Sequence, residues 1–245
     1  MRQIIVTGGG TGLGKAIAAA FAAQGDQVVI TGRRKDVLDQ AAAELGANAR
    51  AVAFDAADPA QVEAALADLP ERVDVLVNNA GGNRDRTGPP LTPQAGLAGL
   101  AARWQANLDA NLFTAVLVTE ALRDRLNPGA RVINFSSIAA HRGGSGSYGA
   151  AKAAIENWNL SLAQEVGPEG ITANVIAPGY ISDTDFFGPD GIPAQRLAYN
   201  VAQSLNKRAG HPEDVVATTL FLASPAAGHL TAQVFHLDGG SITGR

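Results

Sequence analysis

Cysteine is absent from the 245-residue sequence, which excludes disulfide bonds and thiolate metal sites. Aromatic residues make up only 5% of the chain, whereas alanine and glycine are abundant, a composition that suits close packing of helices on a sheet. No apolar run reaches the ~18 residues that a membrane span needs. The net charge of −4 gives no sign of binding to nucleic acid or to an anionic membrane.

The N-terminal residues, the histidine spacing and the length indicate the expected class of protein. The first six residues already have the pattern of a strand and leave no room for a signal peptide, so we expect a cytoplasmic protein. Its histidines are not at metal-ligand spacing, and we predict no metal site: His141, His211, His229 and His236. The length suits one large α/β domain, so residues 1–245 are expected to form a single domain.

A glycine-rich turn follows the first apolar run. Residues 3–6 are apolar, Gly8, Gly12 and Gly14 come next, and a helical pattern then continues to Gly25. Amide groups at a helix start can hold a pyrophosphate, and glycines let the backbone approach it closely. The turn therefore predicts a dinucleotide site, although its spacing differs from the commonest fingerprint and a flexible loop is the alternative.

The end of the second expected strand, residues 27–31, indicates which nucleotide would bind. An acidic residue there suits the ribose hydroxyl of NAD, whereas arginine suits the 2′-phosphate of NADP. Here Gly32 is followed by Arg33 and Arg34, and the first acid is Asp36. Because arginine grips phosphate with two hydrogen bonds, we predict NADP(H), with solvated charges at a helix start as the alternative.

Strands and helices alternate along the rest of the chain, which predicts a right-handed, doubly wound parallel sheet. The fold class is thus α/β, a Rossmann-type seven-stranded parallel sheet with helices on both faces in a three-layer sandwich. The further strands are expected at residues 51–54, 73–77, 131–135, 172–177 and 233–237, and the further helices at 36–45, 59–69, 104–122, 148–165, 194–205 and 213–222.

Tyr148 and Lys152 are spaced to lie on one face of a helix, about one turn apart. A free tyrosine has a pKa near ~10, and an adjacent ammonium favours the phenolate. We therefore expect Lys152 to lower the pKa of Tyr148 so that the pair can transfer a proton near neutral pH. On its own this spacing is also common in ordinary surface helices.

Taken together, the motifs resemble those of the short-chain dehydrogenase/reductase family over essentially the whole chain. The resemblance rests on the glycine turn, residues 78–81 (Asn-Asn-Ala-Gly), the Tyr148/Lys152 pair, residues 178–179 (Pro-Gly) and residues 237–240 (Leu-Asp-Gly-Gly). It implies reversible hydride transfer between NADP(H) and a small-molecule carbonyl or alcohol. Within the family the chain is similar to 3-oxoacyl-[acyl-carrier-protein] reductases.

The resemblance also implies roles for individual residues. The catalytic set is Asn111, Ser137, Tyr148 and Lys152, with Ser136 as the alternative serine. The implied cofactor contacts are Gly8, Thr11, Gly12, Leu13, Gly14, Arg33, Arg34, Asp55, Asn79, Ala80, Gly81, Tyr148, Lys152, Pro178, Gly179, Ile181 and Thr184. The expected substrate contacts are Ser137, Tyr148, His141, Tyr180, Phe186 and Phe187, although His141 also fits an exposed loop position.

Two segments differ from the compact pattern. Residues 82–103 are rich in proline and glycine and are expected to be a loop that shapes the substrate pocket or an oligomer contact, or a neutral insertion. Residues 182–210 are expected to form a substrate lid. The family pairs through the helices near 104–122 and 148–165, so a homotetramer or homodimer is expected.

The remaining alternatives concern activity. Reduction of a 3-oxoacyl thioester or another ketone fits best. An NAD-dependent alcohol or sugar dehydrogenase and a non-catalytic nucleotide sensor are the other interpretations. Because many activities share this fold and these residues, the sequence does not identify the substrate.

Overall fold

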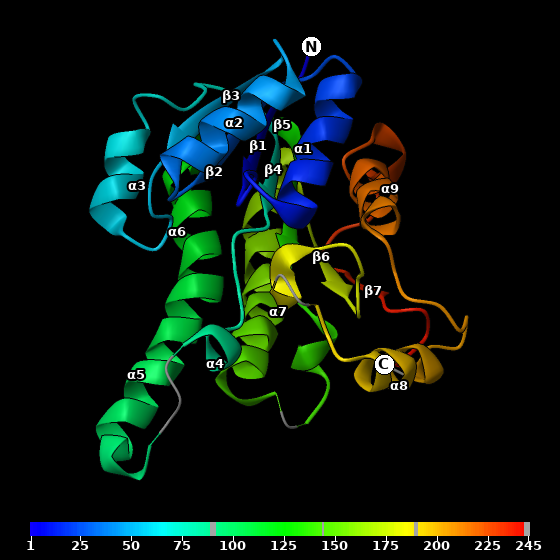
Figure 1. Cartoon of the computed structure of the whole chain (residues 1–245). Helices are drawn as coiled ribbons and strands as arrows, with labels where there is room; N and C mark the ends of the chain where they lie inside the picture. Colours follow the sequence, from blue (N-terminus) through cyan, green and yellow to red (C-terminus); the bar gives the residue numbers. More distant parts are fainter. Residues whose placement is uncertain (89–91, 144, 189–190, 243–245) are drawn as a thin grey trace.

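A parallel seven-stranded sheet is the centre of the fold in the computed structural model, which describes residues 1–88, 92–143, 145–188 and 191–242 (Figure 1). Its order is β3-β2-β1-β4-β5-β6-β7. The order reverses between β1 and β4, which is where such sheets bind ligands. The strands are β1 (Gln3–Thr7), β2 (Gln27–Gly32), β3 (Ala49–Ala53), β4 (Val73–Asn78), β5 (Leu126–Phe135), β6 (Thr172–Pro178) and β7 (Val234–Leu237).

Helices join the strands and cover both faces of the sheet, which confirms the predicted Rossmann-type architecture. They are α1 (Gly12–Ala23), α2 (Lys35–Leu45), α3 (Pro59–Ala65), α4 (Arg84–Thr87), α5 (Gly96–Leu108), α6 (Thr114–Ala121), α7 (Gly146–Val166), α8 (Ala194–Gln203) and α9 (Pro212–Leu222). None of these described helices is long and apolar enough to cross a bilayer.

The two faces of the sheet have separate cores because side chains alternate along each strand. In β1, Ile4 packs in the core that includes Phe21 of α1 and residues of α2 and α9. The next residue, Ile5, packs in the other core with Leu162 of α7 and residues of α3 and α6. Such strands are buried on both sides, which explains their nearly continuous apolar runs.

A chain of buried amides fixes the carboxyl ends of the central strands relative to α7. The Asn78 amide donates to Asn134 Oδ1 at 2.8 Å, and these two residues are paired between β4 and β5. The Asn134 amide donates in turn to Asn159 Oδ1 of α7 at 2.9 Å. Because a buried polar group is costly unless bonded, these bonds stabilise the observed placement of α7 on the sheet.

The segment between β4 and β5 differs from expectation. Residues 82–103 were expected to be a loop, but they contain α4 and the first eight residues of α5. Alanine and leucine after Gly96 are strong helix formers, and they extend the helix expected from Trp104 toward its N-terminus. This part of α5 extends away from the sheet at the lower left of Figure 1. The prolines at positions 89–90 lie outside the described residues.

The helix expected over residues 104–122 is also not uniform. A π-helical turn, Asp109–Phe113, separates α5 from α6. Such turns are rare in proteins and are frequent at functional sites. The turn contains Asn111, the residue to which the family resemblance assigns a catalytic role.

Replacing Leu76 with alanine tests the core that supports the site. Leu76 is fully buried in β4, so Leu76→Ala should lower the free energy of unfolding by about 3 kcal/mol. Leu97→Ala is the matched control, because Leu97 is 84% exposed and its loss should change stability by less than about 0.5 kcal/mol. Urea denaturation measures both, and equal effects would contradict this assignment of the core.

Candidate active site

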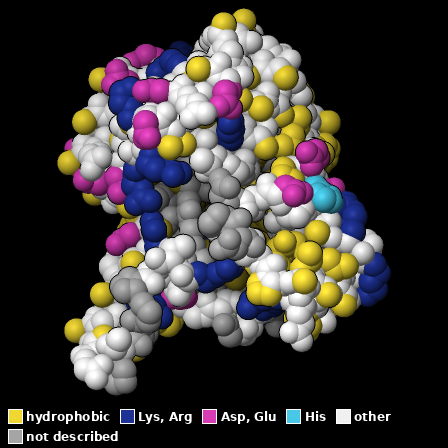
Figure 2. Space-filling view, viewed as in Figure 1, with side chains coloured by type: hydrophobic (Ala, Val, Ile, Leu, Met, Phe, Trp, Pro, Cys, Tyr) yellow, Lys and Arg dark blue, Asp and Glu magenta, His cyan; other side chains and the backbone are white. Residues whose placement is uncertain are grey.

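A cleft of about 880 Å³ opens at the carboxyl ends of the strands. Figure 2 shows it as a hollow with Lys and Arg side chains beside and below it. Its wall includes most of the predicted site residues from both halves of the chain. Those residues are Gly8, Thr11, Gly12, Leu13, Arg33, Arg34, Asp55, Asn79, Ala80, Gly81, Ser137, Tyr148, Lys152, Pro178, Gly179, Ile181, Thr184, Phe186 and Phe187.

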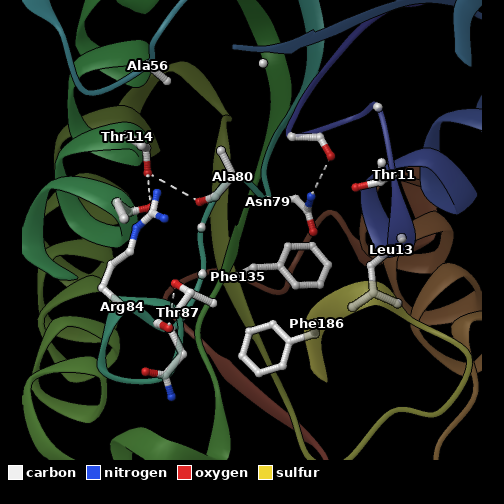
Figure 3. Close-up of a pocket in the computed structure, with 18 of the residues that line it drawn as sticks. Thr11, Leu13, Ala56, Asn79, Ala80, Arg84, Thr87, Thr114, Phe135 and Phe186 are labelled. Carbon is white, nitrogen blue, oxygen red and sulfur yellow. Dashed lines mark hydrogen bonds between the residues drawn. The ribbon is translucent and has the colours of Figure 1, made fainter. Parts of the chain in front are cut away.

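The glycine turn is shaped by backbone that only glycine tolerates well. Gly8 and Gly12 have φ values of +67° and +51°, in the left-handed region. A Cβ on Gly14 would lie 2.2 Å from the Gly8 carbonyl oxygen, so Gly14 supports the turn from beneath and is not among the residues that line the cleft. The Asn79 amide donates to the carbonyl oxygens of Thr7 and Gly8, which joins this turn to β4 (Figure 3).

The turn fits a dinucleotide by two independent observations. A Cβ on Gly12 would meet no atom within 4 Å, so the backbone at the start of α1 faces open space in the cleft. At the end of β2, Thr31 is 1% exposed and its hydroxyl oxygen has no hydrogen-bond partner in the described part of the chain. Buried hydroxyls normally have partners, so a ligand bound beside Arg33 and Arg34 would satisfy this one.

The tyrosine and lysine lie together on the first turns of α7. Lys152 Nζ is 5.9 Å from the centre of the Tyr148 ring and donates to the carbonyl oxygen of Phe135 at 2.8 Å. Both residues are buried, with 6% and 4% of their surface exposed. Ser137, at the end of β5, makes a hydrogen bond with Tyr148 and also accepts one from the Ala139 amide at 3.2 Å.

Burial has a larger effect on the acidity of this pair than the two residues have on each other. It raises the pKa of Tyr148 to about 12, against a smaller lowering by the Ser137 hydrogen bond. It also lowers the pKa of Lys152 to about 7, because a buried ammonium loses its hydration. The structure therefore does not show the expected lowering of the Tyr148 pKa by Lys152, and the phenol is protonated at neutral pH.

The two adjacent serines have different environments. The single hydroxyl proton of Ser136 lies between two acceptors, Glu156 Oε1 at 2.6 Å and the Lys152 carbonyl oxygen at 3.0 Å. Both serines border the cleft. Because the Ser136 hydroxyl is held by a carboxylate, Ser137 is the serine whose hydroxyl is directed to Tyr148.

Asn111 lies behind the cleft wall rather than in it. Its amide donates to the carbonyl oxygens of Gly82 and Asn107, each at 2.9 Å, and its oxygen accepts from the Gly82 amide at 3.2 Å. A Cβ on Gly81 would lie 2.8 Å from Asn111 Oδ1 and 3.3 Å from Lys152 Nζ. Asn111 Oδ1 and Lys152 Nζ therefore both lie against the face of Gly81 that a side chain would occupy.

Two expected substrate contacts lie outside the cleft wall. The ring of His141 pairs with Glu156 at 2.9 Å and packs on His236 with ring centres 4.5 Å apart. Tyr180 packs on Phe187, with ring centres 5.1 Å apart. By contrast Phe186 faces the cleft, 6.1 Å from the Tyr148 ring, so the aromatic wall begins beside the phenol.

Several lining residues were not predicted from the sequence: Thr31, Ala56, Arg84, Thr87, Asp109, Thr114 and Phe135. In Figure 3 Arg84 reaches from α4 toward Thr114, and the rings of Phe135 and Phe186 face the middle of the cleft. Phe135 is the last residue of β5 and Thr31 the last but one of β2, and strand ends were a usable signal. Arg84 and Thr87 lie in the segment 82–103 that was expected to shape the substrate pocket, but the sequence did not predict the helix α4 that carries them.

This chain belongs to the short-chain dehydrogenase/reductase family: a family model described as enoyl-(acyl carrier protein) reductase matches residues 8–241. It is thus an oxidoreductase of a family that uses nicotinamide cofactors. The short-chain reductase protein NovJ of Streptomyces niveus is 36% identical over 252 residues, covering 96% of this chain and 92% of the relative. A 3-oxoacyl-[acyl-carrier-protein] reductase of Synechocystis sp. is 36% identical over 250 residues, covering 97% and 96%.

A solved structure gives the same result at the level of the fold. A short-chain dehydrogenase from Burkholderia cenocepacia, crystallised in complex with NADP, superposes with a TM-score of 0.84 at 31% identity, covering 98% of this chain and 97% of that chain.

The pKa of Lys152 predicts a dependence of stability on pH. Because burial lowers this pKa from 10.5 to about 7, the unfolded chain holds a proton between these values that the folded protein has lost. The free energy of unfolding should therefore rise with pH, by at most ~1.4 kcal/mol per unit. Tyr148 has the opposite effect only above its ordinary pKa of 10.0.

Urea denaturation between about pH 7 and 9.5 measures this slope, and Lys152→Met should remove it. The same slope in Lys152→Met and in the unchanged protein would contradict the burial of a titrating amine.

Proposed function

We propose that this protein is an NADP(H)-dependent reductase that converts a carbonyl to a secondary alcohol, or catalyses the reverse reaction, with a 3-oxoacyl thioester or another ketone as substrate. The observation that carries the proposal is one shared cleft. The glycine turn, the Arg33 and Arg34 side chains and the Ser137, Tyr148 and Lys152 groups all border it.

The adenosine end of the cleft supports the choice of NADP(H). Arg33 and Arg34 would hold the 2′-phosphate, and the unpaired hydroxyl of Thr31 lies at the same strand end. Gly32 stands where a carboxylate would otherwise repel the phosphate. The relative from Burkholderia cenocepacia was crystallised with NADP, which agrees with this choice.

The bound cofactor would supply hydride, and the chain's own residues would manage the proton. With its pKa near 12, Tyr148 is protonated at neutral pH and can donate to the oxygen that becomes an alkoxide. Ser137 would donate a hydrogen bond to the same oxygen, which stabilises charge where it develops. Lys152 would hold the ribose of the cofactor, and Asn111 would link Lys152 to solvent through water.

Residues 182–210 would close over the substrate. The two ends of this segment lie side by side. Ile181 and Gly210 form a β-bridge, and the Ser182 amide donates to the Gly210 carbonyl oxygen at 2.9 Å. Within it, α8 has no buried residue, as expected of an element weakly tied to the body. Phe186 and Phe187 would form an apolar wall against the substrate.

Assembly through α5, α6 and α7 would make a homotetramer or homodimer. Trp104 and Leu160 are each 44% exposed on these helices, and Phe113 is 38% exposed. Exposed large apolar side chains on neighbouring helices are typical of protein interfaces.

Optical measurement of NADPH oxidation with a panel of carbonyls tests the proposal. The panel includes a 3-oxoacyl thioester and simple bulky ketones, and NADH runs beside NADPH. Turnover with NADPH supports the proposal. Tight binding of NADPH without turnover on any carbonyl would favour a nucleotide sensor, and a preference for NADH with alcohols would favour an NAD-dependent dehydrogenase.

Removal of one hydroxyl tests the proton donor. Tyr148→Phe should leave NADPH binding within about twofold and lower kcat by about 10³-fold or more, because the developing alkoxide loses its acid. Ser224→Ala is the control, since it also removes one hydroxyl, which lies just after α9 and bonds the Phe221 carbonyl oxygen, and it should keep its rate. Retained turnover in Tyr148→Phe would remove Tyr148 from the mechanism.

Removal of one guanidinium tests the choice of nucleotide. Arg33→Ala should raise the Michaelis constant for NADPH by about 10-fold or more and that for NADH only slightly, because only NADPH carries the 2′-phosphate. Arg72→Ala, at the opposite end of β4, serves as control. An equal rise for both nucleotides would count against the phosphate role of Arg33.

A further inference from the structure

Asp85 contacts the N-terminus of the helix that carries the tyrosine and the lysine. Its Oδ2 accepts the backbone amide of Tyr148 at 3.1 Å, and its Oδ1 accepts the hydroxyl of Ser147 at 2.7 Å. The side chain comes from α4, 63 residues earlier in the sequence. The first amides of any helix lack partners within the helix, and a carboxylate near them is also favoured by the helix dipole.

The helix has no cap from its own sequence. Ser145 occupies the cap position of α7 but makes no side-chain cap hydrogen bond. Gly146 follows with φ +54°, and a Cβ there would come within 3.0 Å of Asp85 Oδ2. The chain therefore has a glycine where the carboxylate must approach, and the distant Asp85 serves as the cap.

The same carboxylate reaches α5, the helix that leads into the π-helical turn with Asn111. Oδ1 of Asp85 accepts the side-chain amide of Asn107 at 3.0 Å, and Asn107 also donates to Ser147 at 2.8 Å. Asn107 is fully buried, and its carbonyl oxygen accepts the amide of Asn111 at 2.9 Å. A second bond closes the network, because Asn107 Oδ1 accepts the backbone amide of Arg84 at 2.9 Å.

From this geometry we propose that Asp85 is a positioning residue for the reaction: its carboxylate fixes α4, α5 and the first turn of α7 together, and so places the Tyr148 phenol relative to Ser137. The inference rests on the proposed function, in which Tyr148 donates the proton. Misplacement of a reacting group by about 1 Å can cost ~10²-fold in rate. Asp85 bonds the backbone amide of Tyr148 itself, so loss of this bond should affect catalysis.

The chemistry favours a carboxylate over an amide at this position. Oδ1 accepts two donors and Oδ2 accepts a third, and an ionised carboxyl group offers acceptors only. The amide of Asp85→Asn has one oxygen, so it would turn an NH₂ group toward either the Tyr148 amide or the Asn107 amide. Asp85→Asn should therefore behave like Asp85→Ala rather than like the unchanged protein.

Steady-state kinetics of Asp85→Ala and Asp85→Asn test the proposal, with Asp58→Ala as the matched control. Asp58 caps α3 by accepting the amides of Ala60 and Gln61, so its loss removes a helix cap elsewhere in the molecule. Both Asp85 variants should lose about 10- to 100-fold in kcat and keep the Michaelis constant for NADPH within about twofold. Asp58→Ala should keep its kcat.

A double variant separates positioning from general destabilisation. If Asp85 acts through Tyr148, adding Asp85→Ala to Tyr148→Phe should not lower the residual rate further, because the group that Asp85 positions is already gone. A further loss equal to that seen with Tyr148 intact would overturn the proposal, and so would an equal fall in kcat for Asp85→Ala and Asp58→Ala.

Hydrogen exchange gives a readout that does not need turnover. The amides of residues 146–150 should exchange faster in Asp85→Ala and at the original rate in Asp58→Ala. Unchanged exchange in Asp85→Ala would overturn the inference. Failure of the proposed function is distinguishable from this outcome, because it would show as turnover retained by Tyr148→Phe or as no turnover by the unchanged protein.

Discussion

Lys152 places an amine in a buried position at the wall of the cleft, with 4% of its surface exposed, and the rest of the site is arranged around that placement. Its Nζ has the Phe135 carbonyl oxygen as partner, which ties α7 to the end of β5. The buried amides of Asn78, Asn134 and Asn159 bond in sequence and so tie the ends of β4 and β5 to each other and to α7. Because burial brings the pKa of Lys152 to about 7, its charge near neutral pH responds to the charge of whatever occupies the cleft. A neighbouring phenol with a pKa near 12 remains an acid throughout that range.

The adjacent serines show how a strand end divides roles between neighbouring residues. Side chains alternate in an extended chain, so Ser136 and Ser137 point in different directions. The hydroxyl of Ser136 bonds with Glu156 and the Lys152 carbonyl oxygen, which share its one proton, and it so fastens α7 to the end of β5. Ser137 is left to bond with Tyr148. The support of α7 and the polar group beside the phenol therefore come from consecutive residues.

Local patterns predicted the features that depend on local geometry. The turn at Gly8 and Gly12, the alternation of strands and helices and the helix that presents Tyr148 and Lys152 follow from local spacing, and the doubly wound parallel sheet was predicted correctly. The sequence-based prediction that the pKa of Tyr148 is lowered was wrong. Burial raises this pKa, and burial is decided by tertiary packing. Asp85 gave no signal for the same reason: its three donors lie at least 22 residues away in sequence.

That separation along the chain has a consequence for biosynthesis. Asp85 leaves the ribosome 63 residues before Tyr148, which at ordinary rates of synthesis is about 3 to 13 s. During this interval strands β1 to β4 can pair with one another, since they are neighbours in the sheet. Asp85, the residue that caps α7, is thus already present in the first half of the nascent chain before α7 is synthesised. Tyr148 reaches its position only when the second half of the chain packs against the first.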